Sequence, residues 1–263
     1  MSLLSRVIAV AGKGGTGKTT LAALIIRYLC RTEEIPILAV DADANTNLHE
    51  ALGMELKSTV GSIREEVLES IRELPPGISK DTYIEFKIQE ALVESEKFDL
   101  LSMGRPEGPG CYCYANTILR RCLDALSENY QYVVVDNEAG MEHLSRRTTR
   151  DVDFLLVVSD PTLRGVETAV RIRDLASELK LKIKKIFLII NRIEGKPHPS
   201  VLSELKKGEL KLAGIVPNDE LIPRYDIEHR SLLDLPETSK AVQAVDGMME
   251  ELLAIQTSRR KIT

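Results

Sequence analysis

The chain has 263 residues, of which 43% are hydrophobic and 29% charged, and this ordinary composition excludes a disordered, collagen-like or low-complexity protein. Its 35 basic and 40 acidic residues give a net charge of −5, which argues against nucleic acid as a partner. The apolar runs are far shorter than the roughly 20 residues that span a membrane. We expect one cytoplasmic domain over residues 1–263, with four reduced cysteines and no stable membrane association.

Short runs rich in Val, Ile and Leu alternate with segments of helical period along the chain. This alternation is typical of a doubly wound α/β fold, in which a mostly parallel sheet of about seven or eight strands carries helices on both faces. We expect strands at residues 6–10, 36–40, 99–103, 131–135, 154–158, 186–190 and 212–216. Helices are expected at residues 19–30, 115–126, 165–179 and 238–255. Ligands bind such sheets beyond the carboxyl ends of the strands.

Two segments need a separate interpretation. Residues 57–97 are polar, carry Pro75-Pro76-Gly77 and break the alternation, so we expect an insertion on the same domain. Residues 241–255 have a helical apolar stripe whose opposite face is acidic. An acidic face does not suit a membrane surface, so we expect this helix to pack on the sheet.

A phosphate-binding loop follows the first expected strand. Residues 12–19 fit G-x-x-x-x-G-K-S/T in the strand, loop and helix context that this motif requires. The glycines let successive N–H groups turn toward one concavity, and Lys18 is expected along the β- and γ-phosphates with the Thr19 hydroxyl on Mg²⁺. The sequence therefore predicts a triphosphate and Mg²⁺ site made by Gly12, Gly14, Gly15, Thr16, Gly17, Lys18, Thr19 and Thr20.

The loop holds a second lysine, Lys13, directly after its first glycine. A long cation there overshoots its own phosphates and can reach a nucleotide on a second subunit. With this lysine, residues 12–20 resemble the deviant Walker A motif of the superfamily of MinD, ParA and the nitrogenase iron protein. These are dimeric ATPases in which the extra lysine contacts the partner's ATP. The resemblance implies a nucleotide-driven homodimer with catalytic roles for Lys13 and Lys18.

The resemblance extends to residues that follow other strands. Residues 41–43 are similar to the D-x-D of switch I, and residues 136–140 to the D-x-x-A-G of switch II. Asn191-Arg192 resembles the adenine-side element of the family, and Pro217-Asn218 its second base-side loop. Glu194 stands where a guanine-binding box carries Asp, so ATP is the expected nucleotide and ADP the product.

Three carboxylates and one glycine are the expected partners of the γ-phosphate. We assign the orientation of the attacking water to Asp43, and expect Asp41 and Asp136 near Mg²⁺ and the Gly140 N–H at the γ-phosphate. Each carboxylate alone fits a helix cap or a solvated strand end equally well. Ala44 departs from the family, where Pro is frequent after the second switch I aspartate.

Cys111 and Cys113 follow a stretch rich in Gly and Pro at residues 104–110, so we expect a metal-binding loop over residues 104–114. One C-x-C segment supplies half of a tetrahedral site, and a twofold axis can bring two copies together as four thiolates. Such a site accepts Zn²⁺ or Ni²⁺. A redox dithiol, a 4Fe–4S cluster that bridges the dimer, and two inert cysteines are the alternatives that the spacing leaves open.

Together with residues 137–144, the cysteine pair most resembles the CooC family, the accessory ATPases that insert nickel into carbon monoxide dehydrogenase. The resemblance implies an ATP hydrolase that holds nickel on Cys111 and Cys113, with Zn²⁺ able to occupy the same site, and that has carbon monoxide dehydrogenase as its client. A positioning ATPase of the MinD/ParA kind and an iron–sulfur carrier or scaffold ATPase are the alternative functions.

Overall fold

The computed structural model describes residues 5–32, 35–63, 79–105, 126, 129–139 and 151–260. In these ranges the strands are β1 Arg6–Gly12, β2 Ile37–Ala42, β3 Val93–Glu94, β4 Asp99–Ser102, β5 Tyr132–Asn137, β6 Asp151–Ser159, β7 Lys182–Ile193 and β8 Lys211–Pro217. They form one sheet of eight strands in the order β3-β4-β2-β5-β1-β6-β7-β8. Neighbours are parallel, except that β3 runs antiparallel to β4.

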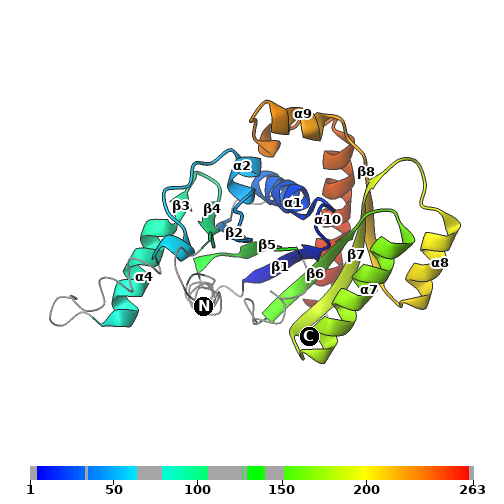
Figure 1. Ribbon diagram of the computed structural model, residues 1–263, viewed down its shortest axis with the longest axis horizontal. Helices are drawn as coiled ribbons and strands as arrows, with labels where there is room; N and C mark the ends of the chain where they lie inside the picture. Colours follow the sequence, from blue (N-terminus) through cyan, green and yellow to red (C-terminus); the bar gives the residue numbers. More distant parts are fainter. Residues whose placement is uncertain are drawn as a thin grey trace.

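Helices cover both faces of this sheet (Figure 1). They are α1 Lys18–Thr32, α2 Leu48–Leu52, α4 Lys80–Ala91, α7 Leu163–Glu178, α8 Pro199–Lys207, α9 Leu221–Ile227 and α10 Lys240–Arg260, with a 3₁₀ turn η2 at Leu232–Asp234. Helices α4, α7 and α8 contribute to the apolar cluster on one face, and α1, α2, α9 and α10 to the cluster on the other. This arrangement confirms the predicted α/β class.

The central strand β1 shows why the chain folds this way. Ile8 and Val10 are buried on the side of α1 and α10, whereas Ala9 and Ala11 are buried on the side of α7. Because successive side chains of a strand point to opposite faces, a strand that is apolar at every position must be covered on both. The loop that follows β1 therefore leaves the sheet at its centre.

All seven expected strands are present, and most extend further than predicted. The structure adds β3 and places both β3 and α4 within residues 57–97, so the expected insertion contributes a strand to the main sheet. A strand of two residues is too short to show an alternating pattern, which is why the sequence did not predict it. Of the helix expected at residues 115–126, Leu126 alone lies within the described residues.

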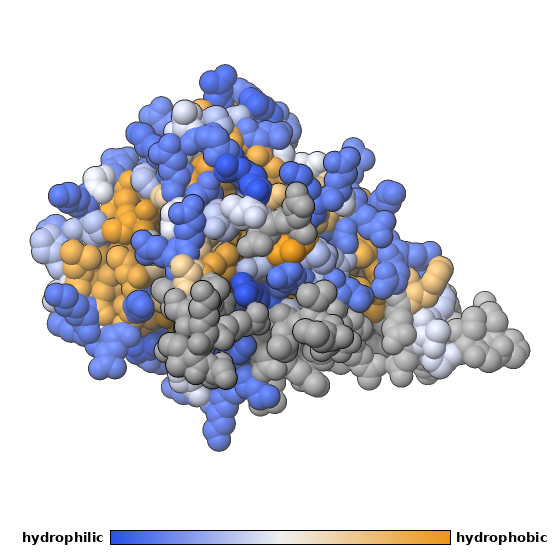
Figure 2. Space-filling model, turned by 180° about the vertical axis from the view of Figure 1, so that it is seen from behind, coloured by the Kyte–Doolittle hydropathy of each residue, from blue (hydrophilic) through white to orange (hydrophobic). Residues whose placement is uncertain are grey.

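Helix α10 packs against the sheet beside β8, as expected. Its buried apolar residues are Ala241, Val242, Val245, Met248, Met249 and Leu252. Seen from behind, the molecule is largely hydrophilic, and apolar side chains gather on the side that carries β8 and α10 (Figure 2). Within the described ranges, we find no helix whose length and apolar character would allow it to cross a membrane.

Asp219 joins the end of β8 to the start of α10. Its Oδ2 accepts hydrogen bonds from the Ser239 hydroxyl at 2.7 Å and the Ala241 N–H at 3.1 Å, and its Oδ1 accepts one from the Leu221 N–H at 2.9 Å. Burial favours the neutral acid, but these hydrogen bonds outweigh it and hold the pKa of Asp219 below its ordinary value. The carboxylate thus fixes two helix starts at once.

Asp219→Ala should lower the free energy of unfolding at neutral pH by about 2–3 kcal/mol, because several donors lose a charged acceptor. Urea unfolding measures this. Glu220→Ala is the matched control, since Glu220 is exposed and its side chain makes no capping bond to α9; its effect should stay within about 0.5 kcal/mol. The stabilisation belongs to the ionised form, so it should persist above about pH 5 and fade as acid protonates Asp219. Equal losses in both variants would contradict this role.

Candidate functional site

A cleft of about 1090 Å³ lies at the carboxyl edge of the sheet. Its walls come from the loop between β1 and α1, the β2–α2 connection, the end of β7 and the β8–α9 connection. Of the predicted site residues, it is lined by Gly14, Gly15, Gly17, Lys18, Thr19, Thr20, Asp43, Asn191, Arg192, Pro217 and Asn218. The structure therefore brings the predicted phosphate end and the predicted base end together in one cavity.

The other predicted residues lie outside the wall of this cleft. Thr16, Asp41 and Asp136 are buried, and Lys13 is exposed. Gly12 is also buried, and a Cβ at this position would overlap the carbonyl oxygen of Val158 in β6. Gly140, Cys111 and Cys113 lie outside the described residues, so their predicted roles remain predictions.

The loop between β1 and α1 is wound around one carbonyl group. The Lys13 carbonyl oxygen accepts hydrogen bonds from the Thr16 N–H at 3.4 Å, the Thr16 hydroxyl at 2.9 Å and the Lys18 ammonium group at 3.4 Å. Gly15 and Gly17 have φ angles of +78° and +88°, which glycine adopts without strain. The loop thus closes into a compact turn directly before α1.

Lys18 is the cation at the floor of the cleft. It is buried, and burial lowers the pKa of its ammonium group. The negative charges of Asp136, Asp43 and Glu138 oppose this effect, in that order. A positive charge held where water has little access interacts strongly with a phosphate group.

Asp41 has a structural task that the sequence did not reveal. Its Oδ1 accepts a hydrogen bond from the Asp43 N–H at 3.0 Å, and its Oδ2 accepts one from the Leu48 N–H at 2.9 Å. Burial is the main reason that its pKa is raised to about 6. Since both oxygens already bond to backbone, Asp41 fixes the segment that carries Asp43 and begins α2.

Asp136 is the better candidate for a metal ligand. It is 1% exposed and lies next to Asp41 in the register of β5 and β2. Burial raises its pKa to about 7, the Thr19 hydroxyl opposes this by a hydrogen bond, and the charge of Asp41 adds to it. Its buried Oδ1 has no hydrogen-bond partner among the described residues. An orphaned carboxylate oxygen beside a threonine hydroxyl fits Mg²⁺, which prefers such hard oxygen ligands.

The cleft also has walls that the sequence did not predict. One is the end of α2 with the residues after it, among them Glu50, Gly53 and Met54; another is the end of α9, with Asp226 and Arg230. Helices of five and seven residues show too few turns for a periodic pattern. Asn137 was likewise missed; its Nδ2 donates to the Val10 carbonyl oxygen at 2.9 Å and joins β5 to β1 beside the loop.

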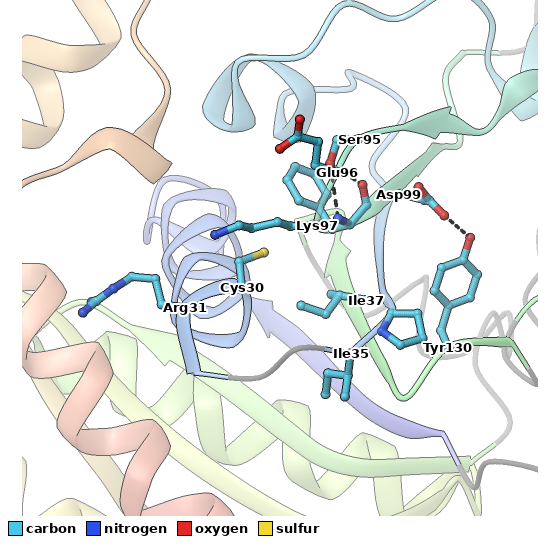
Figure 3. A pocket seen from close by; sticks show the side chains of 11 residues that line it. Cys30, Arg31, Ile35, Ile37, Ser95, Glu96, Lys97, Asp99 and Tyr130 are labelled. Atoms are coloured by element: carbon cyan, nitrogen blue, oxygen red, sulfur yellow. Dashed lines mark hydrogen bonds between the residues drawn. The ribbon is translucent and has the colours of Figure 1, made fainter.

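A second hollow, of about 560 Å³, lies at the opposite edge of the sheet, where α1 ends and β2 and β4 begin (Figure 3). Tyr130 donates a hydrogen bond to Asp99 across it, and burial together with this bond raises the pKa of Tyr130 above its ordinary value. Burial also raises the pKa of the Cys30 thiol to about 11. This hollow is separate from the cleft that the phosphate loop lines.

Comparison with known proteins agrees with this geometry. The family model of the CobQ/CobB/MinD/ParA nucleotide binding domain matches residues 7–232. An uncharacterized ATP-binding protein of Methanocaldococcus jannaschii is 43% identical over 94% of this chain and 98% of its own length. The carbon monoxide dehydrogenase accessory protein CooC of Rhodospirillum rubrum is 30% identical over 87% of this chain and 89% of its own length. The septum site-determining protein MinD of Pyrococcus horikoshii, solved with Mg-ADP, superimposes with a TM-score of 0.68 at 18% identity, over 95% of this chain and 96% of that one.

Asp136→Asn should make the ligand-free protein more stable at about pH 8, by about 1–3 kcal/mol, because the wild type must bury an unpaired charge there. A raised native pKa stabilises the fold at low pH, and this contribution is lost as the pH rises through about 7. Thermal melting without Mg²⁺ at about pH 5.5 and 8 measures the difference. Asp43→Asn, at a partly exposed carboxylate, is the control and should change this pH dependence less. Identical pH dependence in the wild type and Asp136→Asn would contradict the assignment.

Cys30 should alkylate slowly at neutral pH, because a thiol with a pKa of about 11 is almost entirely protonated there. The rate with iodoacetamide should rise about tenfold for each pH unit up to that pKa. Mass spectrometry of the peptide that contains Cys30 follows the reaction, and a small-molecule thiol of ordinary pKa is the control. Rapid labelling of Cys30 at neutral pH would show that its surroundings do not suppress the thiolate.

Proposed function

We propose that this chain, which belongs to the CobQ/CobB/MinD/ParA family of nucleotide-binding domains, is an ATPase that binds nickel between two protomers and assists its insertion into carbon monoxide dehydrogenase. The observation that carries the nucleotide part is the juxtaposition of the orphaned Asp136 oxygen, Thr19 and Lys18 under the phosphate loop. That set suits a triphosphate with Mg²⁺ and has no evident structural purpose.

In this proposal each end of the cleft has its own task. Lys18 and the loop amides bind the β- and γ-phosphates, and Thr19 and Asp136 would hold Mg²⁺, which neutralises phosphate charge when bound. Asp43 lines the cleft and orients the water that attacks the γ-phosphate. Pro217 and Asn218 lie on the base side of the same cavity. The cleft thus takes ATP lengthwise.

Lys13 provides the link to a second protomer. Its side chain is exposed at the loop, whereas Lys18 is buried beneath it. An exposed cation at this place can neutralise charge on the partner's triphosphate, as an arginine finger does. ATP would then favour the dimer, and by linkage the dimer would bind ATP more tightly.

The nickel part rests on the C-x-C pair and on the likeness to CooC. Two protomers related by a twofold axis would contribute Cys111 and Cys113 each, which gives four thiolates for one ion. Zn²⁺ fits the same ligands, and Ni²⁺ binds them in a square-planar arrangement. The described part of the chain holds no group of three or more His, Cys, Asp or Glu that could bind a metal ion, so this pair is the candidate.

Metal analysis of anaerobically purified protein tests the nickel site. With a non-hydrolysable ATP analogue, the wild type should form a dimer that holds about one Ni²⁺, and Cys111→Ser with Cys113→Ser should lose the ion but still bind the analogue. Cys30→Ser is the matched control and should retain the metal, because Cys30 lies at the end of α1 away from the cleft.

Three results would contradict this function. Stoichiometric Ni²⁺ in the double variant would exclude the assigned ligands. Visible absorbance of an iron–sulfur cluster would favour a cluster carrier. A dimer that binds ATP without metal, and that sediments with lipid vesicles or DNA, would favour a positioning ATPase.

A further inference from the structure

The phosphate loop is tied to the end of β7 by two side chains. The Nδ2 of Asn191 donates a hydrogen bond to the Thr16 carbonyl oxygen at 2.7 Å, and the Nη1 of Arg192 donates one to the Gly15 carbonyl oxygen at 3.0 Å. Asn191 is 5% exposed, so its bond is shielded from water, whereas Arg192 reaches over the loop from the exposed side. Two consecutive carbonyl groups of the loop are thereby fixed from outside the loop.

The surroundings of these two side chains fit that contact closely. A Cβ at position 17 would overlap the Nδ2 of Asn191, so the glycine admits the asparagine. Arg192 has a φ of +56°, which a residue with a side chain rarely adopts. The Asn191 Oδ1 accepts a hydrogen bond from the Arg192 N–H at 2.9 Å, which holds this uncommon backbone in place. The chain therefore tolerates backbone strain at the point where the guanidinium group is aimed at the loop.

The amide of Asn191 is fully engaged in these contacts. Its nitrogen bonds to the loop and its oxygen to the neighbouring backbone N–H. In this arrangement neither end is free to read the edge of a base. Base contacts would then fall to other parts of the cleft wall, such as Asn218, which is exposed on the base side.

Fixing a carbonyl group also fixes the next amide. In a trans peptide the C=O and N–H groups point in opposite directions, so a Thr16 carbonyl held by Asn191 turns the Gly17 N–H away from it. A loop with glycines at positions 14, 15 and 17 has many conformations to lose when it binds phosphate. Contacts that order the loop beforehand remove part of this entropic cost from binding.

We infer that Asn191 and Arg192 are positioning residues that hold the phosphate loop in its binding conformation from the end of β7. This inference rests on the proposed function, because it takes the loop to bind a polyphosphate. It assigns to both residues a task that is separate from contact with the base, and it connects the two ends of the cleft.

Inorganic tripolyphosphate, which has no base, separates the two tasks. Isothermal titration calorimetry would compare Mg-tripolyphosphate with Mg-ATP for the wild type, Asn191→Ala, Arg192→Gly and Asn218→Ala. Glycine is the suitable replacement for Arg192, because it removes the guanidinium group and adopts the positive φ without strain. Thermal melting checks that each variant is folded, and Arg192→Gly keeps the test decisive if Asn191→Ala does not fold.

Asn191→Ala and Arg192→Gly should each weaken tripolyphosphate and ATP by the same factor, about tenfold, the effect of one lost hydrogen bond. Asn218→Ala should weaken ATP and leave tripolyphosphate unchanged. If Asn191→Ala and Arg192→Gly weaken ATP alone, the two residues read the base and the inference is overturned. If the wild type binds neither ligand, the proposed function falls and the inference falls with it.

Discussion

An imbalance of buried charge lies under the phosphate loop, and the rest of the site depends on it. Asp41 and Asp136 end neighbouring strands and Lys18 begins α1, so two carboxylates share one ammonium group where the sheet and the helices exclude water. Without a bound cation, such a group of charges is unfavourable and the carboxylates hold protons more tightly than in water. A divalent cation relieves this imbalance, which links the stability of the fold to occupation of the site.

The fold supplies that arrangement at no local expense. Parallel strands that are apolar on both faces end at a common edge, and the first polar residue after each run is then delivered to the same place. Asp41 and Asp136 reach it in register because β2 and β5 pair directly. The loop that follows β1 arrives beside them since β1 pairs with β5 on its other side. Chemistry at the edge is thus a consequence of packing in the core.

The sequence predicted those parts of the molecule whose signal is local. The apolar runs of β1 and β5 and the glycine-rich loop between β1 and α1 are read from consecutive residues, and the structure bears out the strands and the α/β class. The short elements β3, α2 and α9 were missed, since two to seven residues show no period. The roles assigned to Lys13, Asp43 and the cysteine pair remain predictions.

The bond between Asn191 and Thr16 shows the other limit of sequence reasoning. It joins atoms 175 positions apart in the chain, and nothing in the spacing of either motif indicates it. The same holds for Asp41, whose carboxylate is occupied by two backbone amides that only the folded chain places around it. Motifs name the residues of a site, but which partner each one takes depends on the three-dimensional arrangement.

The left-handed backbone at Arg192 sets thermostability against activity at a single position. A screen for heat resistance alone should accept glycine there, because glycine removes the strain and no core packing is lost with an exposed side chain. A screen for turnover should restore arginine. An engineer who seeks a more robust form of this protein would therefore do well to leave this residue untouched and to look for gains elsewhere in the fold.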